Sequence, residues 1–215
     1  MAHCGALARL AATGGNSLIL FCEGGGDTRA AQAAARKAFS VLAAKAGLEG
    51  RLPKVIACGG RSTAIRDFDI AVNRGGAAVL LVDSESPVAE GAKAASHLID
   101  RGEWTGAPGD PRIHLMVQVM ESWFLAQPEV LESHFGKGFD KNALPRLASV
   151  ELLAKDKVYT ALDKASNGCK RGPYSKSKQQ GFQILEGLDV NSIKSASAFG
   201  RLFFEYLDKH CGESA

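Results

Sequence analysis

The strongest indication of the fold class is the segment Ala77-Ala78-Val79-Leu80-Leu81-Val82-Asp83-Ser84-Glu85. It begins as a continuous apolar run after two turn glycines, which is typical of a strand buried on both faces of a parallel sheet. Two carboxylates separated by one serine end the run. The stretch therefore predicts an α/β fold in which acidic side chains stand at the carboxyl end of a buried strand.

The neighbouring segments supply the other elements of such a fold. Strands are predicted at residues 17–22, 54–58 and 113–120, the last with one buried face because apolar and polar residues alternate along it. Helices are predicted from Thr28 to Gly47 and over residues 64–73 and 89–101. Because the strands alternate with helices, we expect a Rossmann-like, mainly parallel sheet flanked by helices, with right-handed crossovers.

The chain divides into three parts on this interpretation. Residues 1–16 are a lead-in, residues 17–126 form the α/β core, and residues 127–215 form a helical lobe packed on the core. Helices are expected over 128–135 and 152–165. A final amphipathic helix carries its apolar stripe at Phe199, Leu202, Phe203, Tyr206 and Leu207. An apolar terminal helix also favours a homodimer.

Composition excludes several classes of protein. The five cysteines are widely spaced and include no C-x-x-C pair, which argues against a zinc site or a disulfide framework and favours a reduced, cytoplasmic protein. No apolar run approaches the roughly 20 residues of a membrane span, and residues 1–9 lack the pattern of a secretory signal. No G-x-x-x-x-G-K-[ST] motif is present, so the chain is not a P-loop ATPase.

Three carboxylates follow predicted strands. Glu23 comes directly after the run at 17–22, and Asp83 and Glu85 follow the run at 77–82. The carboxyl ends of parallel strands share one rim, so these acids converge there. Asp83 and Glu85 are two residues apart, so in extended geometry both side chains leave the same face. Such carboxylates repel one another unless a hard divalent cation such as Mg²⁺ lies between them.

Two more acids are candidates for the same rim. Asp27 follows the glycines that come after Glu23, and it is either a further metal ligand or the cap of the next helix. Glu121 follows the fourth predicted strand, and it is either a rim ligand or an acid that the helix dipole favours at a helix start.

This pattern resembles the Toprim domain, which topoisomerases, bacterial primases and the overcoming-lysogenization-defect nucleases share. The wider chain resembles a bacterial family of Toprim-like proteins, often of unassigned function and associated with ABC-type ATPases. The stretches that carry the resemblance are Phe21–Thr28, Leu81–Glu85 and His114–Leu125, with weaker support from Phe139–Pro145 and Gly172–Leu188.

The resemblance implies a role for each acid. Glu23 is implied as a metal-proximal acid or base, and Asp83 and Glu85 as ligands of Mg²⁺ or Mn²⁺. The usual Toprim pair is Asp-x-Asp, whereas the second member here is Glu85. Its extra methylene moves the carboxylate by about an ångström or more, which puts the metal geometry and the activity in doubt.

Basic residues provide candidate contacts to nucleic acid. From Lys164 to Gly181 the chain has five cations and no acid, which is either a solvated loop or a patch that contacts phosphates. Tyr174 lies within this run and is a candidate for stacking on a base. The candidate nucleic-acid contacts are Lys155, Lys170, Arg171, Lys176 and Lys178.

Two functions of different classes remain open. One is a metal-dependent nuclease that cuts DNA or RNA; by resemblance, it is the effector of a partner ATPase in phage defence. The other is a non-catalytic interaction subunit whose rim binds metal or a phosphate ligand. Clustering of the acids and the basic patch around one cleft favours the enzyme.

Overall fold

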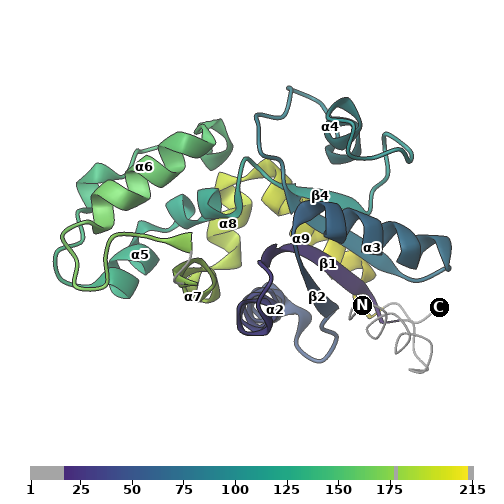
Figure 1. The fold of residues 1–215 in the computed structure, drawn as a ribbon, viewed down its shortest axis with the longest axis horizontal. Helices are drawn as coiled ribbons and strands as arrows, with labels where there is room; N and C mark the ends of the chain where they lie inside the picture. Colours follow the sequence, from purple (N-terminus) through teal and green to yellow (C-terminus); the bar gives the residue numbers. More distant parts are fainter. Residues whose placement is uncertain (1–16, 177–178, 213–215) are drawn as a thin grey trace.

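The computed structural model describes residues 17–176 and 179–212, and the sheet in this part of the chain has four parallel strands. Their spatial order is β2-β1-β3-β4. The strands are β1 (Ile19–Gly25), β2 (Lys54–Gly59), β3 (Ala78–Asp83) and β4 (Ile113–Met116). Helices flank the sheet on both sides, which confirms the expected α/β class (Figure 1). The expected lead-in of residues 1–16 and the candidate Lys178 lie outside the described residues.

Both faces of the sheet are covered because successive strand residues are apolar on both sides. On one face, Leu20 of β1 packs in a core with α2 (Arg29–Ala43). On the other face, Phe21 of the same strand packs in a second core with α3 (Arg61–Asn73) and α4 (Ala94–Asp100). β3 is buried along its whole length, as its apolar run predicts. The carboxyl ends of β1 and β3 are therefore held by rigid central strands.

The fourth strand differs from its prediction. β4 ends at Met116, and all four of its residues are buried instead of one face only. The second face is covered because the ring of His114 packs against those of Phe203 and Tyr206, with centroids 5.5 and 4.9 Å apart. The prediction of a half-exposed strand through residue 120 was wrong, because a helix distant in sequence buries its polar side.

The helix expected over residues 89–101 is also shorter than predicted. α4 begins only at Ala94, after Lys93 in an extended conformation. Gly91 has φ 73°, outside the helical region, so the chain before α4 cannot continue the helix backwards.

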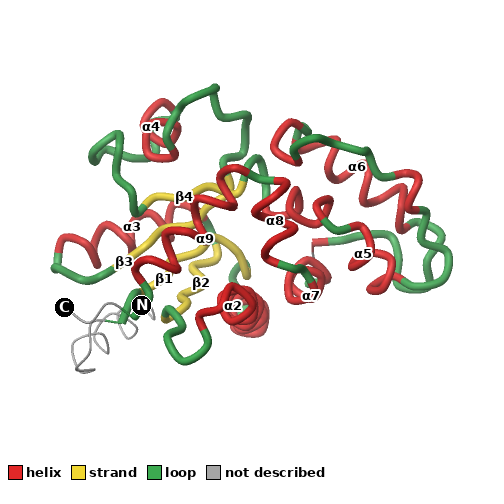
Figure 2. Tube along the Cα trace, turned by 180° about the vertical axis from the view of Figure 1, so that it is seen from behind, coloured by secondary structure: helices red, strands yellow, loops and turns green. Residues whose placement is uncertain are grey.

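The rest of the described chain is helical. Its elements are a 3-10 helix at Met120–Ala126, α5 (Pro128–Phe135), 3-10 turns at Lys141–Ala143 and Val150–Leu152, α6 (Lys155–Ser166), α7 (Gln180–Gly187), α8 (Val190–Ala196) and α9 (Ala198–His210). In Figure 2, α5, α6 and α7 lie together to one side of the sheet, whereas α9 returns to pack on it.

The packing of α9 is rotated from the predicted stripe. Phe203 and Leu207 are buried as expected, but Phe204 is buried too, whereas Leu202 is 53% exposed. The assignment of Leu202 to the docking face was therefore wrong. None of the described helices combines the length and apolarity that crossing a membrane requires.

Candidate metal centre

The strand order creates a crevice between β1 and β3. From β1 the chain crosses through α2 to β2 on one side, and it then crosses back through α3 to β3 on the other side. Because connections leave these neighbouring strands in opposite directions, their carboxyl ends bound an open space, where doubly wound sheets commonly bind ligands. Glu23 lies near the end of β1, and Asp83 is the last residue of β3.

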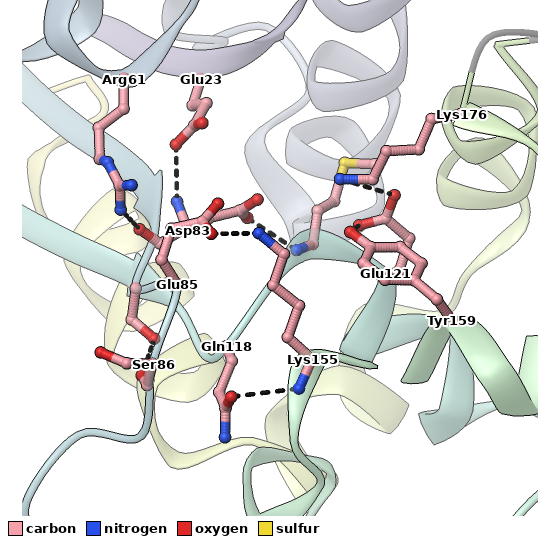
Figure 3. A network of polar contacts seen from close by, with 12 residues as sticks. Glu23, Arg61, Asp83, Glu85, Ser86, Gln118, Glu121, Lys155, Tyr159 and Lys176 are labelled. Carbon is pink, nitrogen blue, oxygen red and sulfur yellow. Dashed lines mark hydrogen bonds and ion pairs between the residues drawn. The ribbon is translucent and has the colours of Figure 1, made fainter. Parts of the chain in front are cut away.

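The structure brings Glu23, Asp83 and Glu85 together at this crevice. One carboxylate oxygen of each residue lies within 4.8 Å of the other two. Oε2 of Glu23 also accepts a hydrogen bond of 3.2 Å from the backbone amide of Asp83, which joins the ends of β1 and β3 (Figure 3). Oδ1 of Asp83 accepts a hydrogen bond of 2.7 Å from the amide of Met120. Backbone amides thus position the carboxylates of Glu23 and Asp83, which together with Glu85 form the acid cluster.

Glu85 reaches the cluster through a turn and not through extended geometry. It has φ 63°, a left-handed conformation that glutamate rarely adopts, so the expectation from its spacing to Asp83 was wrong. Its amide donates a hydrogen bond of 2.8 Å to the carbonyl of Gln118, which holds the turn. Its carboxylate forms an ion pair with Lys155 at the start of α6.

Burial and mutual repulsion shift the pKa values of the three carboxyl groups. The pKa of Asp83 is raised well above its usual range, because burial disfavours the charged form and because Glu23 and Glu121 lie nearby. Burial also raises the pKa of Glu23, although the charge of Arg61 opposes this rise. Burial acts in the same direction on Glu85, but the contact with Lys155 outweighs it and leaves the pKa of Glu85 lowered.

This donor set fits a hard divalent cation. All three ligand atoms are carboxylate oxygens, which Mg²⁺ and Mn²⁺ prefer over nitrogen or sulfur ligands. A cation among them would remove the repulsion that raises the pKa values of Asp83 and Glu23. It would compete with Lys155 for the carboxylate of Glu85.

Asp27 lies beside the acid cluster but is not a member of it. The hydroxyl of Thr28 caps α2 by accepting a hydrogen bond of 3.2 Å from the amide of Ala31, so Asp27 is not the cap. Asp27 is exposed and lines the same cavity as Glu23 and Asp83. Among the described residues, the group of carboxylates whose oxygens lie within 4.8 Å of one another does not include Asp27.

Glu121 is buried, with 2% of its surface exposed, and it anchors a separate network. Its carboxylate accepts a hydrogen bond of 2.8 Å from the hydroxyl of Tyr174. It also accepts one of 3.2 Å from the hydroxyl of Tyr159, and Nζ of Lys176 lies 3.6 Å away (Figure 3). Burial, reinforced by the charge of Glu121, raises the pKa values of both tyrosines, so both stay protonated donors. Tyr174 thus holds Glu121, a role that its place in the basic run did not indicate.

A cavity of about 510 Å³ opens onto Glu23 and Asp83. Its walls come from the glycines at the end of β1, the start of α2, the 3-10 helix at Met120–Ala126 and the start of α7 with the segment before it. The lining residues include Gly24, Gly25, Gly26, Asp27, Thr28, Met120, Glu121, Tyr174, Lys176 and Phe182. Acids from the sheet and a cation from the basic run therefore share one cleft.

Two of the candidate lysines contact the acids of this site. Lys155 pairs with Glu85, and Lys176 approaches Glu121 while lying 4.7 Å from the centre of the Tyr159 ring. Arg61, which no sequence pattern above singled out, donates a hydrogen bond of 2.9 Å to the carbonyl of Asp83. It follows the glycines at the end of β2, so the strand-end signal that singled out Glu23 could have found it.

Two other candidates lie elsewhere. Lys170 and Arg171 are exposed, and neither is among the described residues that line the cavity. Arg171 lies near His134 of α5, where burial and then this positive charge lower the pKa of the imidazole. The basic run is therefore divided, because Lys176 belongs to the site and these two residues do not.

Comparisons with known proteins give one match. A family model described as a domain of unknown function, DUF4276, matches residues 22–207. Searches of curated proteins and of solved structures find no significant match.

Proposed function

We propose a function from the premise that this chain belongs to the DUF4276 family, whose model covers most of its length. The proposal is that the protein is a metal-dependent phosphodiester hydrolase, a nuclease acting on DNA or RNA. The observation that carries it is the approach of Glu23, Asp83 and Glu85 within 4.8 Å at the crevice between β1 and β3. Oxygen ligands of this kind hold the Mg²⁺ or Mn²⁺ that phosphodiester hydrolysis commonly employs.

The bound cation would supply a water of lowered pKa and would neutralise charge on the phosphate. The residues of this chain perform the remaining tasks. Asp83 and Glu85 hold the ion, and Glu23 accepts the proton of the attacking water or returns one to the leaving oxygen. Glu23 is placed for such proton exchange, because an oxygen of its carboxylate lies within 4.8 Å of carboxylate oxygens of Asp83 and Glu85, which would hold the ion.

Cations around the cavity would bind the nucleic-acid backbone. Lys155 and Lys176 lie at the acids and suit the phosphates next to the cut bond. Lys170 and Arg171, which are exposed and do not line the cavity, would then contact phosphates farther along the strand, and Lys178 is kept as a candidate phosphate contact on its sequence alone.

We also propose a cellular setting. The resemblance to Toprim-like proteins supports a role as the effector of an ABC-type ATPase in phage defence. Free thiols at Cys22, Cys58, Cys169 and Cys211 support a reduced, cytoplasmic location.

The second candidate is an interaction subunit that binds a metal or a phosphate ligand without turnover. The observation that favours it is the ion pair between Lys155 and Glu85, which occupies one of the three carboxylates. Because Lys155 already neutralises Glu85, a ligand must displace this lysine before it can bind all three carboxylates.

Calorimetry with Mg²⁺ and Mn²⁺, together with cleavage of plasmid DNA, single-stranded DNA and RNA in the same samples, tests the two candidates. Asp83→Asn removes the central charge at nearly constant shape, and Asp163→Asn, at an exposed position on α6, is the matched control. The nuclease proposal expects wild type and Asp163→Asn to bind metal and to cut at least one of these nucleic acids, and Asp83→Asn to do neither. Metal binding without cleavage of DNA or RNA favours the interaction subunit. Absence of metal binding in the wild type overturns the nuclease proposal.

A further inference from the structure

The cavity beside the acid cluster has an apolar wall that phosphodiester hydrolysis alone does not require. Its lining includes Ala31, Met116, Met120 and Phe182 in addition to the acids and Lys176. A site that bound only the phosphate would need positively charged side chains and backbone amides. An apolar surface next to carboxylates and a lysine instead suits a ligand with a flat hydrophobic part joined to a phosphate.

Phe182 forms a distinct part of this wall. It belongs to α7 and is half-buried, so part of its ring remains accessible. Gly24, at φ 123°, allows the ring to approach the loop, since a Cβ built there would lie 3.3 Å from Cζ of Phe182. A Cβ on Gly181 would lie only 2.9 Å from the hydroxyl oxygen of Tyr174 and 3.2 Å from the Met120 methyl group. Gly24 thus leaves room for the tip of the Phe182 ring, and Gly181 leaves room for Tyr174 and Met120 at the neighbouring part of the wall.

The depth of the acids limits what can reach them. Asp83 is 7% exposed and lines the cavity, so a phosphodiester must enter the cavity to meet its carboxylate. A base that is paired and stacked in a duplex must leave the stack to follow its phosphate inwards. An unpaired nucleotide enters without that loss, and any base can stack on an aromatic ring.

We propose that the cavity receives one unpaired nucleotide, with its base against Phe182 and its phosphodiester at the acid cluster. The substrate class is therefore single-stranded nucleic acid or an unpaired end, in preference to an intact duplex. The inference rests on the proposed nuclease function for its cleavage, but the base-binding half can be measured separately.

Binding of a 5′-mononucleotide is compared with binding of inorganic phosphate, which lacks a base, by calorimetry on the full chain with and without Mg²⁺. Phe182→Leu keeps apolar bulk without the flat ring, Phe182→Tyr keeps the ring, and Leu202→Ala changes an exposed leucine that does not line this cavity. We expect the mononucleotide to bind wild type about tenfold or more tightly than phosphate does. Phe182→Leu should lose that advantage, whereas Phe182→Tyr and Leu202→Ala should keep it.

Cleavage is measured on one oligonucleotide as a single strand and as a perfect duplex. We expect faster cleavage of the single strand, and a loss of about tenfold in Phe182→Leu on that substrate. Equal cleavage of both forms, unchanged in Phe182→Leu, would overturn the inference and leave the nuclease function intact. Failure to bind metal or to cut either form would overturn the nuclease function. In that case, equal affinity for mononucleotide and phosphate would overturn the base pocket as well, and a Phe182-dependent advantage of the mononucleotide would support it.

Discussion

The carboxylate of Glu23 accepts a hydrogen bond of 3.2 Å from the backbone amide of Asp83, although 60 residues separate the two in sequence. The contact links the two strand ends that bound the crevice, and it places the Glu23 carboxylate beside that of Asp83. Two acids so close in a half-buried site destabilise one another unless a proton or a cation intervenes. The electrostatics of this pair lead to the first prediction.

Asp83→Asn should stabilise the metal-free protein. The pKa of Asp83 is raised in the folded state, so the folded state binds more protons than the unfolded state above the unfolded pKa of about 3.9. The contribution of Asp83 to stability is therefore lost as pH rises, and the neutral asparagine removes that loss. We expect the free energy of unfolding at neutral pH, measured with urea and a chelator, to rise by about 1 kcal/mol or more. At a Mg²⁺ concentration of about 100 times Kd, wild type should gain about 2.7 kcal/mol and Asp83→Asn nothing. A less stable metal-free variant would contradict the argument.

Lys155→Met should tighten metal binding. Lys155 pairs with Glu85, so a cation that uses this carboxylate must displace the lysine. The side chains of the pair are 35% and 24% exposed, which limits the gain to about 1 kcal/mol, or about fivefold in Kd. Calorimetry with Mg²⁺ measures the change, and Lys155→Arg, which keeps the charge, is the control. Weaker binding in Lys155→Met would show that Lys155 does not compete with the metal.

Tyr174→Phe should destabilise the protein more than Tyr159→Phe. Both hydroxyls donate to the buried carboxylate of Glu121, at 2.8 Å from Tyr174 and 3.2 Å from Tyr159. Loss of a hydrogen bond to a buried carboxylate costs about 1.5–3 kcal/mol, and the shorter bond should lie at the upper end. Urea unfolding of the two single variants and the double variant measures the loss in the free energy of unfolding for each hydroxyl and the coupling between the two losses. Equal and small losses would indicate that water replaces the hydroxyls.

Gly25→Ala should be far more harmful than Gly26→Ala. Both glycines have positive φ, 87° and 50°, so an alanine at either position costs about 1–2 kcal/mol of backbone strain. At Gly25 a Cβ would also lie 2.7 Å from Cα of Gln32, whereas at Gly26 it would meet nothing within 4 Å. We expect Gly25→Ala to push α2 away from β1 and to lower the melting temperature well below that of Gly26→Ala. Similar melting temperatures would contradict the close approach of α2.

His114 should make the protein less stable in acid. Burial lowers its pKa to about 4, although the Pro111 carbonyl and Asp110 oppose the shift and His210 adds to it. In the unfolded state the imidazole has a pKa of about 6.5, so between about pH 6.5 and pH 4 it is protonated in the unfolded state and neutral in the folded state. The free energy of unfolding therefore falls as pH drops through this range. The loss reaches about 3 kcal/mol at the lower pH. His114→Phe keeps the ring contacts with α9 and should remove this part of the pH dependence of urea unfolding. An unchanged slope would show that His114 is already protonated in the fold.

Sequence patterns alone are enough to predict the sheet class and the place of Glu23 and Asp83 at strand ends. Apolar runs bounded by glycines identify buried parallel strands, because only such strands need side chains that are apolar on both faces. Since parallel strands end at one rim, residues that follow them, such as Glu23 and Asp83, are expected at a common site.

Which of these groups meet, and in what geometry, depends on contacts between segments that lie far apart in the sequence. The side chain of Lys155 and the turn at Glu85 depend on contacts with residues far away in sequence, which local periodicity does not encode. The burial of β4 on both faces depends in the same way on α9. Packing also separates the cations of the basic run, since Lys176 lies beside Glu121 whereas Arg171 lies near His134. The periodicity of apolar residues indicates which side chains are buried. It does not indicate which distant segment covers them, because that depends on packing across the whole chain.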